Sequence, residues 1–416
     1  MCPGGGQRGS FRSAPASLFE SQEQPCFYCS IFREDTLTVQ FSDVIVIGGG
    51  IIGAACAFRL SEAGLRVTVL DRGAAPGRGS SGRSGAGVRV QFSEEVNVRL
   101  SWESIQEYQR FPELYGRESG YVQNGYLFLV PEAAWEAHEQ GVAVQRAVGA
   151  PVEVVTPQEG ARYVPYLLGG IYRCTYGPQD GYIDPLLTLN AYTDMALGRG
   201  AELHRQAEVT HIEAVGEGWT VYSSQGDFSA PLIVNASGAW SGAVAALAGL
   251  DVPVRPRRRS VYRTKTGNGQ PSYPLTVDVA SNLWLRGHND TVIFTVSNPY
   301  QPDGLEEGID WPWLTHVREV ARDRFPWLAE LEVDRSYSFW GYYEMTPDGS
   351  PILGRMAEAP GWINACGFSG HGVQQAAAVG RIVAAFAQDQ EPFIDVSSLR
   401  LERFGQGAAT AERHIV

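Results

Sequence analysis

A glycine-rich turn between two apolar runs, within residues 43–71, constrains the fold more than any other feature of this chain. The first run ends in Gly48-Gly-Gly-Ile-Ile-Gly53, an alanine-rich stretch follows, and the second run ends at Asp71. This order predicts strand, turn, helix and strand, in which Gly48 permits the turn, Gly50 lets a pyrophosphate approach, and Gly53 lets the helix pack closely. Asp71 follows at the distance of about 20 residues at which a carboxylate accepts hydrogen bonds from a ribose. The pattern predicts a dinucleotide-binding unit, with a purely structural glycine turn as the alternative.

Composition and charge narrow the possible functions. The 416 residues are 44% hydrophobic and 19% charged, as in a folded globular protein. The net charge of −13 argues against nucleic acid as a partner, and no apolar run reaches the ~20 residues that span a bilayer. Lys265 is the single lysine among 33 basic residues, a bias that indicates a GC-rich bacterial genome. We therefore expect a cytoplasmic bacterial protein without a transmembrane segment.

The cysteines and histidines give no sign of a metal site. The six cysteines are too few for a disulfide framework at this length. Cys26 and Cys29 have the CxxC spacing but no second pair of ligands nearby, and the seven histidines lack ligand spacing. We expect no metal ion in this protein.

Glycine content and periodicity divide the rest of the chain. Residues 1–40 are rich in Gly, Ser and Pro, and we expect a disordered tail or an over-extended gene start. Residues 72–88 are too glycine-rich for a helix or strand, and we expect this loop to run beside the bound cofactor. Helical spacing then runs from Ser93, the expected N-cap, to Arg110, and strand-like segments dominate residues 255–335.

Five motifs occur in an order that resembles one known family. They are the glycine turn 48–53, Ile183-Asp-Pro185, Val234-Asn-Ala-Ser-Gly-Ala-Trp-Ser241, Gly341-Tyr-Tyr-Glu-Met-Thr-Pro-Asp-Gly-Ser-Pro351 and Gly367-Phe-Ser-Gly-His-Gly372. Over about residues 41–405 the chain resembles the FAD-dependent D-amino-acid oxidase superfamily. Within it, residues 85–93 and 370–376 are most similar to the group of the sarcosine oxidase β-subunit, dimethylglycine dehydrogenase and mitochondrial FAD-oxidoreductase-domain proteins.

The resemblance implies an α/β fold in two interleaved parts. One is a Rossmann-like FAD-binding domain, and the other is an α+β substrate domain built on a mixed or antiparallel β-sheet. By this pattern the FAD-binding domain comprises residues 41–116, 168–254 and 337–405. The substrate domain comprises residues 117–167 and 255–336, and residues 406–416 are a tail.

The resemblance also implies which residues bind FAD. The turn Gly370-His-Gly372 opens a helix whose positive end, in the family, faces the flavin pyrimidine edge, where negative charge develops on reduction. An ordinary glycine-rich helix start is the alternative, and we assign His371 no acid–base role. The expected FAD-binding residues are Gly48, Gly50, Ile51, Ile52, Gly53, Asp71, Arg72, Ser80, Ser81, Val209, Ala236, Ser237, Gly238, Gly370, His371, Gly372, Val373 and Gln374.

Arg89 is the expected substrate ligand. It matches the arginine that grips the substrate carboxylate in sarcosine-type oxidases, and a guanidinium pairs with a carboxylate through two hydrogen bonds. In a chain rich in arginine, an exposed or structural role for Arg89 is the alternative, and Arg83 is a rival for the same task. Gln374 stands where those oxidases have a lysine as a second carboxylate ligand.

Two departures from the oxidase pattern concern the flavin. Gly341 matches a cysteine that attaches the flavin in monomeric oxidases, so we expect non-covalent FAD. The segment 291–297 lacks the lysine that speeds reaction with dioxygen in those oxidases, and Lys265 lies on a different strand. We therefore expect a dehydrogenase that is reoxidised slowly in air, and the electron acceptor, dioxygen or a carrier, stays open.

Two clusters of side chains can be explained either by a function or by ordinary structural packing. Tyr342, with Trp340 and Tyr343, is a candidate wall for a cationic amine, and core packing explains the same residues equally well. The basic run 255–260 is interpreted as the start of a strand with solvated arginines, with a phosphate-binding patch as the alternative.

Together these features predict an FAD-dependent oxidoreductase. It would oxidise the C–N bond of a small amino acid or N-methyl amino acid, of the sarcosine, glycine or D-amino-acid type, by hydride transfer to flavin N5. The alternatives are an NAD-dependent dehydrogenase and a non-catalytic FAD-bound assembly factor.

Overall fold

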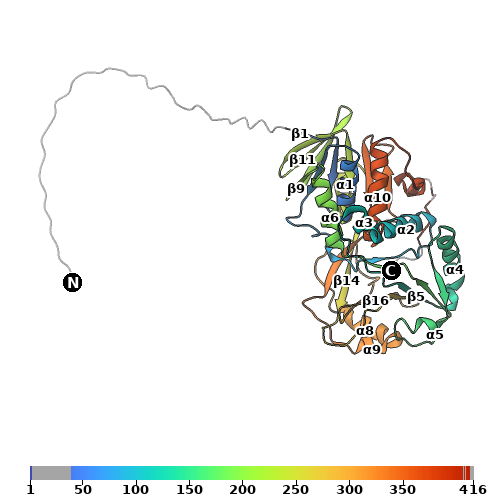
Figure 1. Cartoon of the computed structure of the whole chain (residues 1–416). Helices are drawn as coiled ribbons and strands as arrows, with labels where there is room; N and C mark the ends of the chain where they lie inside the picture. The colour runs from blue at the N-terminus through green and yellow to red at the C-terminus, as the bar shows by residue number, and fades with distance from the viewer. Residues whose placement is uncertain (2–38, 406, 408, 413–416) are drawn as a thin grey trace, which may run out of the picture. The chain divides into compact units, whose positions relative to one another are not determined.

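The computed structural model describes residues 1, 39–405, 407 and 409–412 (Figure 1). The Cys26–Cys29 pair and most of the expected N-terminal tail lie outside the described residues. Gln40, at the end of that expected tail, belongs to β1 (Gln40–Phe41), which pairs with β12 (Gly226–Ala230). The fold therefore includes Gln40, which the sequence placed in the tail.

A six-stranded sheet forms the Rossmann-like unit. Its strands are parallel except for β19 at one edge, and helix α1 packs against both α6 and α10 beside it (Figure 1). The two apolar runs of the first motif form β2 and β3, which are buried because helices cover a parallel sheet. The strands in spatial order are β19 (Ile352–Arg355), β20 (Trp362–Cys366), β13 (Leu232–Asn235), β2 (Val44–Ile47), β3 (Val67–Asp71) and β9 (Glu202–Arg205). The helices are α1 (Ile51–Glu62), α6 (Pro185–Leu197) and α10 (Gly372–Ala387).

An eight-stranded mixed sheet forms the second part. Neighbouring strands are antiparallel except for the parallel pair β15 and β5. Its strands in order are β18 (Phe339–Met345), β14 (Arg255–Arg263), β17 (Thr291–Val296), β16 (Leu283–His288), β15 (Leu275–Asp278), β5 (Tyr126–Val130), β7 (Arg173–Gly177) and β6 (Glu153–Val155). The predicted fold class is confirmed, and β7 and β18, which the sequence assigned to the FAD-binding part, are hydrogen-bonded into this second sheet.

Smaller elements complete the fold. A four-stranded sheet has the order β1, β12, β11 (Gly218–Ser223) and β10 (Val209–Val215), and β4 (Gly87–Val88) pairs with β8 (Gly181–Tyr182). The remaining helices and 3-10 turns are η1 (Ser81–Arg83), α2 (Glu95–Gln109), α3 (Phe111–Tyr115), α4 (Glu132–Ala147), α5 (Pro157–Gly160), η2 (Gly238–Trp240), α7 (Ser241–Ala246), α8 (Trp313–Arg324), α9 (Pro326–Ala329), η3 (Ser397–Leu399) and η4 (Leu401–Phe404).

The start of α2 differs from the predicted N-cap. The helix begins at Glu95, and Ser93 does not cap it. Instead, the buried carboxylate of Glu412 accepts the N–H groups of Ser93 and Glu94 at 2.9 and 3.1 Å. A residue from the expected C-terminal tail therefore holds the two residues that precede α2, which a local sequence pattern could not reveal.

The carboxyl ends of β2, β13 and β20 meet at one edge of the six-stranded sheet, because β13 pairs with both of the others. Beyond this edge the chain enters the turn at Gly48, the turn at residues 236–238 and the turn at residues 367–371. In open α/β sheets ligands bind at this edge. The topology thus brings three of the five sequence motifs together.

Candidate functional site

A cavity of about 470 Å³ lies at the carboxyl edge of the six-stranded sheet and is lined by residues of both large sheets. This volume falls in the range of about 300–1,000 Å³ that is typical of small-molecule sites. Every predicted cofactor or substrate residue lines the cavity except Gly53, which is buried inside α1. The rival Arg83 lines it as well, whereas Trp340 and Lys265 do not.

The first turn is shaped by two glycines that admit no side chain. Gly48 has a φ of +108°, and a Cβ there would lie 2.4 Å from the carbonyl oxygen of Ala236. A Cβ on Gly53 would lie 1.8 Å from the carbonyl oxygen of Gly48. The predicted roles in the turn and in close helix packing therefore have a direct steric basis. Gly50 is the N-cap residue of α1 and lines the cavity. The backbone N–H groups at this end of the helix therefore lie beside the cavity.

Asp71 ties the end of β3 to this turn. Its Oδ2 atom accepts the N–H of Gly49 at 2.6 Å, and its Oδ1 atom accepts the N–H of Gly73 at 2.6 Å. Each carboxylate oxygen has room for a further donor. Asp71 can therefore hold the turn in place and still accept a hydroxyl from a ribose.

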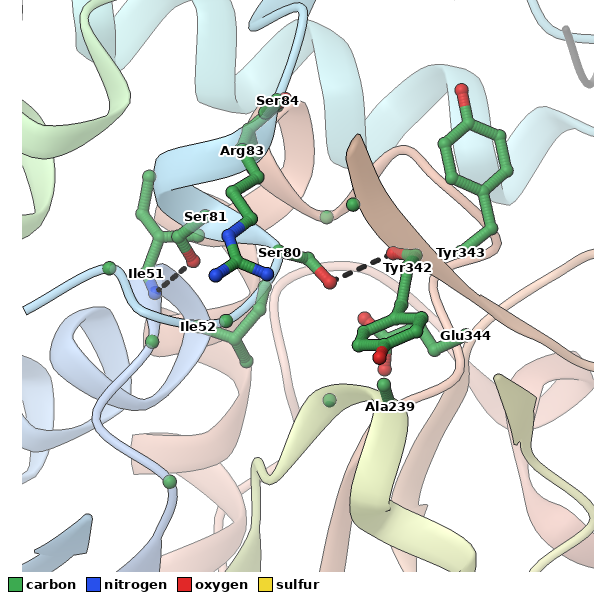
Figure 2. A pocket seen from close by; sticks show the side chains of 18 of the residues that line it. Ile51, Ile52, Ser80, Ser81, Arg83, Ser84, Ala239, Tyr342, Tyr343 and Glu344 are labelled. Atoms are coloured by element: carbon green, nitrogen blue, oxygen red, sulfur yellow. Dashed lines mark hydrogen bonds between the residues drawn. The ribbon is translucent and has the colours of Figure 1, made fainter. Parts of the chain in front are cut away.

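The glycine-rich loop after β3 bridges the two parts of the protein. The hydroxyl of Ser81 accepts the N–H of Ile51 at 3.0 Å, and the hydroxyl of Ser80 donates to the carbonyl of Tyr342 at 2.8 Å (Figure 2). The guanidinium of Arg72 lies 3.9 Å from the ring centre of Trp240. Two adjacent residues of the loop thus contact the start of α1 and β18, and both line the cavity.

The Gly-His-Gly turn presents the start of α10 to the cavity. Gly370 has a φ of +96°, and a Cβ there would lie 2.4 Å from the ring of Tyr343. His371 is the N-cap residue, and its Nε2 atom is buried with no hydrogen-bond partner among the described residues. Burial, and then Arg89, lower the pKa of His371 to about 3, so the imidazole is neutral at ordinary pH. The positive charge at this end of the cavity therefore comes from the helix and from arginine.

Arg89 is buried, so the alternative that it is an exposed surface arginine is wrong. Its guanidinium lies 4.0 Å from the ring centre of Phe92 and donates to the carbonyl of Gln91. Its backbone N–H donates to the side-chain oxygen of Gln374 at 2.9 Å. Arg89 and Gln374, which were chosen as a pair from the family pattern, are therefore in contact beside the start of α10.

The charged residues that line the cavity and that the sequence did not single out include Arg259 on β14 and Glu344 on β18. Arg259 belongs to the run that we interpreted as solvated arginines, and this interpretation is wrong for Arg259, whose Nε atom is buried. Burial raises the pKa of Glu344 to about 7, although the N–H of Gly367 donates to it at 2.9 Å. The alternation of Arg259 with Val261, which also lines the cavity, is the signal that could have found Arg259.

The positions of the free cysteines decide whether a cysteine could attach a flavin covalently. Cys56, Cys174 and Cys366 are buried, and none of these three lines the cavity. Gly341 lines it, but a Cβ there would lie 2.6 Å from the carbonyl oxygen of Arg83. In the part of the chain that the structure describes, no group of three His, Cys, Asp or Glu side chains is placed to hold a metal ion.

The cavity fits a dinucleotide with an electron-poor ring. Glycines at the first turn let a pyrophosphate approach the start of α1, and Asp71 can accept a ribose hydroxyl. The start of α10 and the unpartnered Nε2 atom of His371 offer polar contacts at another part of the cavity. These residues match the adenosine, pyrophosphate and ring portions of FAD.

Comparisons with known proteins agree with this fit. A family profile described as DAO, FAD dependent oxidoreductase, matches residues 43–386. The FAD-dependent oxidoreductase domain-containing protein 1 of Xenopus laevis is 30% identical over 433 residues, covering 90% of this chain and 85% of that protein. Mitochondrial sarcosine dehydrogenase of Mus musculus is 26% identical, and the match covers 87% of this chain but only 41% of that longer protein.

Solved structures show the same fold. The L-proline dehydrogenase of P. horikoshii superposes with a TM-score of 0.82 at 28% identity, covering 89% of this chain and 99% of that one. The glycine oxidase of Geobacillus kaustophilus superposes with a TM-score of 0.77 at 23% identity, covering 88% and 99%. The second comparison bears on the fold alone.

The predicted cytoplasmic, bacterial origin stays a prediction. Among the described helices, none has the length and apolar character needed to cross a membrane. The sarcosine and dimethylglycine dehydrogenases that the chain resembles are named as mitochondrial proteins.

The cofactor and the class of reaction follow from the family. Its members among the relatives and structural neighbours are FAD-dependent oxidoreductases, so FAD is the cofactor and the predicted enzyme class is confirmed. The alternative of an NAD-dependent dehydrogenase is thereby overturned. By its profile match, its relatives and its fold, this chain belongs to the DAO family of FAD-dependent oxidoreductases.

Proposed function

We propose that this enzyme oxidises the C–N bond of a small amino acid or N-alkyl amino acid. The observation that carries the proposal is the buried guanidinium of Arg89, which lines the cavity beside the start of α10. The names of the similar proteins support the same class, since they act on sarcosine, dimethylglycine and L-proline. A non-catalytic assembly role does not account for a cationic group buried at the flavin cavity.

The residues that hold the cofactor are those of the two helix ends. Gly50, Ile51 and Ser81 line the cavity at the start of α1, where the pyrophosphate would lie. The backbone of residues 370–374 would face the flavin ring, whose negative charge on reduction suits a helix N-terminus. When bound, FAD supplies the acceptor for a hydride from the C–H bond beside the substrate nitrogen.

The chain's part in the reaction is to hold the substrate. Arg89 would bind the carboxylate through its guanidinium, and a fixed carboxylate orients the C–H bond toward the cofactor. Tyr342 lines the same cavity and would contact the amine end. The imidazole of His371 is neutral, and its low pKa makes it a poor proton acceptor. The amine would therefore enter the cavity unprotonated. Water then hydrolyses the imine product to a carbonyl compound and an amine.

Two properties of the flavin accompany this proposal. We expect FAD to be held without a cysteinyl bond, because none of the three described cysteines lines the cavity. The strand β17 carries no lysine toward the cavity, where only Thr295 and Ser297 of this stretch line it. Slow reoxidation by dioxygen, and hence transfer to another electron carrier, is the expected behaviour.

The test is anaerobic bleaching of the visible flavin spectrum with a panel of N-methyl, cyclic and D-amino acids. Loss of the flavin band with one class identifies the substrate class, and admission of air then separates a dehydrogenase from an oxidase. Arg89→Met should raise the substrate concentration needed for bleaching, whereas Arg83→Met should leave it nearly unchanged. A protein that keeps its flavin band with every amine would overturn the proposal.

A further inference from the structure

Three consecutive arginines on β14 have different surroundings. Arg257 pairs with Asp303 at 2.6 Å, and Arg258 pairs with Glu306 at 3.3 Å. Within the described part of the chain, no carboxylate lies within ion-pair distance of Arg259. Arg259 alone among the three lines the cavity.

The side chain of Arg259 is held at the cavity with spare hydrogen-bonding capacity. Its guanidinium lies 5.2 Å from the ring centre of Tyr343, and one terminal nitrogen donates to the carbonyl of Arg258 at 3.2 Å. Its Nε atom is buried and has no partner among the described residues. Burial lowers the pKa of Arg259, against smaller opposing effects of Tyr343 and Asp303.

Such an arrangement is costly for folding. An ionic group removed from water is strongly disfavoured unless it is paired, and a buried donor without an acceptor costs about 1–3 kcal/mol. Arg257 and Arg258 both have carboxylate partners. Arg259 lines the cavity without one among the described residues, so its guanidinium is open to an anionic ligand that enters there.

Tyr343 links this arginine to the substrate site. Both Arg259 and Arg89 lower the pKa of its phenol, against the larger effect of burial, so both guanidinium groups lie within electrostatic range of one ring. The same ring packs against Gly370 at the start of α10. Arg259 and Arg89 thus reach one region of the cavity from β14 and from the loop after β4.

We propose that Arg259 is a second carboxylate ligand of the substrate site and that Tyr343 positions its guanidinium. This inference rests on the proposed function, because it takes the substrate to carry a carboxylate. It also accounts for Gln374, which stands where similar oxidases have a lysine: the second cation comes from β14 instead of α10. Two guanidinium groups that reach the same carboxylate would fix it in both position and plane.

The test measures ligand binding to the FAD-loaded enzyme, independently of turnover. Pyrrole-2-carboxylate and its neutral carboxamide are titrated separately while the visible spectrum of the bound flavin is followed. Arg259→Met should raise the Kd of the carboxylate about 10- to 100-fold and leave that of the carboxamide nearly unchanged. Arg257→Met, which removes the same charge from the same strand outside the cavity, is the matched control and should change neither value.

Thermal unfolding separates a binding role from a structural one. Because Arg259 carries a buried, unpaired donor, Arg259→Met should keep or raise the melting temperature, and Arg259→Lys should recover part of the carboxylate affinity. The inference is overturned by equal losses for acid and amide, by equal losses in the Arg257 and Arg259 variants, or by a wild-type enzyme that does not bind the carboxylate. If no amine bleaches the flavin but carboxylate binding still depends on Arg259, the proposed function fails, and Arg259 is then a carboxylate ligand of the cavity for a compound other than an oxidised amine.

Discussion

The carboxylate of Asp71 accepts the N–H of Gly49 at 2.6 Å, so the last residue of β3 holds the glycine turn that follows β2. Its other oxygen accepts the N–H of Gly73 at 2.6 Å and holds the start of the next loop. One side chain therefore shapes both backbone segments between which the adenosine end of FAD would lie. Its position gives the acid in the sequence pattern a structural role: the carboxylate organises the turn and can still accept a ribose hydroxyl.

Asp71→Ala should weaken FAD binding more than it weakens the fold. The change removes a ribose acceptor and leaves two backbone donors without their partner, for which we expect a loss of roughly 2–3 kcal/mol, or about 30- to 150-fold in Kd. Flavin content after purification and fluorescence titration of the apoprotein with FAD provide the measurement. Asp43→Ala removes a carboxylate that pairs with the exposed Arg66 at the other end of β2, and this control should retain FAD. Equal flavin loss in the two variants would count against a specific role for Asp71.

Gly53→Ala should prevent the first turn from forming correctly. The new Cβ would lie 1.8 Å from the carbonyl oxygen of Gly48, so α1 must move away from the turn. We expect a lower melting temperature together with loss of FAD. Gly169→Ala is the control, because no atom lies within 4 Å of its Cβ position and its φ is not positive. A flavin-loaded Gly53→Ala protein with unchanged melting temperature would contradict the steric argument.

The sequence predicted the elements whose signals are local. The glycines at 48–53 and 370–372 each begin a helix where the pattern placed it, because turn geometry and helix starts depend on neighbouring residues. Arg89 and Gln374 were found only through the family pattern, since no local rule joins two residues so far apart in the chain. Their contact depends on the packing of the loop after β4 against α10.

The positions of the residues that the sequence did not identify, Arg259 and Glu412, depend on contacts between distant parts of the chain. Whether Arg259 faces water or the cavity is decided by the pairing of β14 with β18, in which Arg259 stands opposite Gly341. Composition alone made the whole basic run look solvated. Glu412 was missed for a similar reason, because the N–H groups that it accepts belong to Ser93 and Glu94, 319 and 318 positions earlier in the chain.

Glu412→Ala should destabilise the start of α2. The carboxylate accepts the backbone and hydroxyl groups of Ser93, the N–H of Glu94 and the side-chain amide of Asn97, at 2.8–3.1 Å. Loss of these hydrogen bonds to a charged acceptor should cost about 1–3 kcal/mol, although the amide of Asn97 keeps its bond to Ser350. Thermal unfolding should show the decrease, whereas Glu391→Ala, a change at an exposed position, should not. A melting temperature unaltered by the Glu412 change would show that the C-terminal segment does not support α2.

The pH dependence of stability should identify Glu344 as a group that is protonated in the folded protein. Burial raises its pKa from 4.5 to about 7, so between these values the folded state binds a proton that the unfolded state has released. Stability from this group is therefore fully present below about pH 4.5 and is lost as the pH rises toward 7, by at most roughly 3 kcal/mol.

Glu344→Gln isolates this effect, because an amide oxygen can still accept the N–H of Gly367 and no longer titrates. The melting temperature of the wild type relative to that of the variant should fall between pH 5 and pH 8. Asp180, whose pKa burial also raises to about 7, is present in both proteins and cancels in the comparison. A difference in melting temperature that does not change with pH, or that changes in the opposite direction, would mean that Glu344 is ionised in the folded enzyme. The same comparison made on flavin reduction would show whether the proton on Glu344 is needed at the cavity.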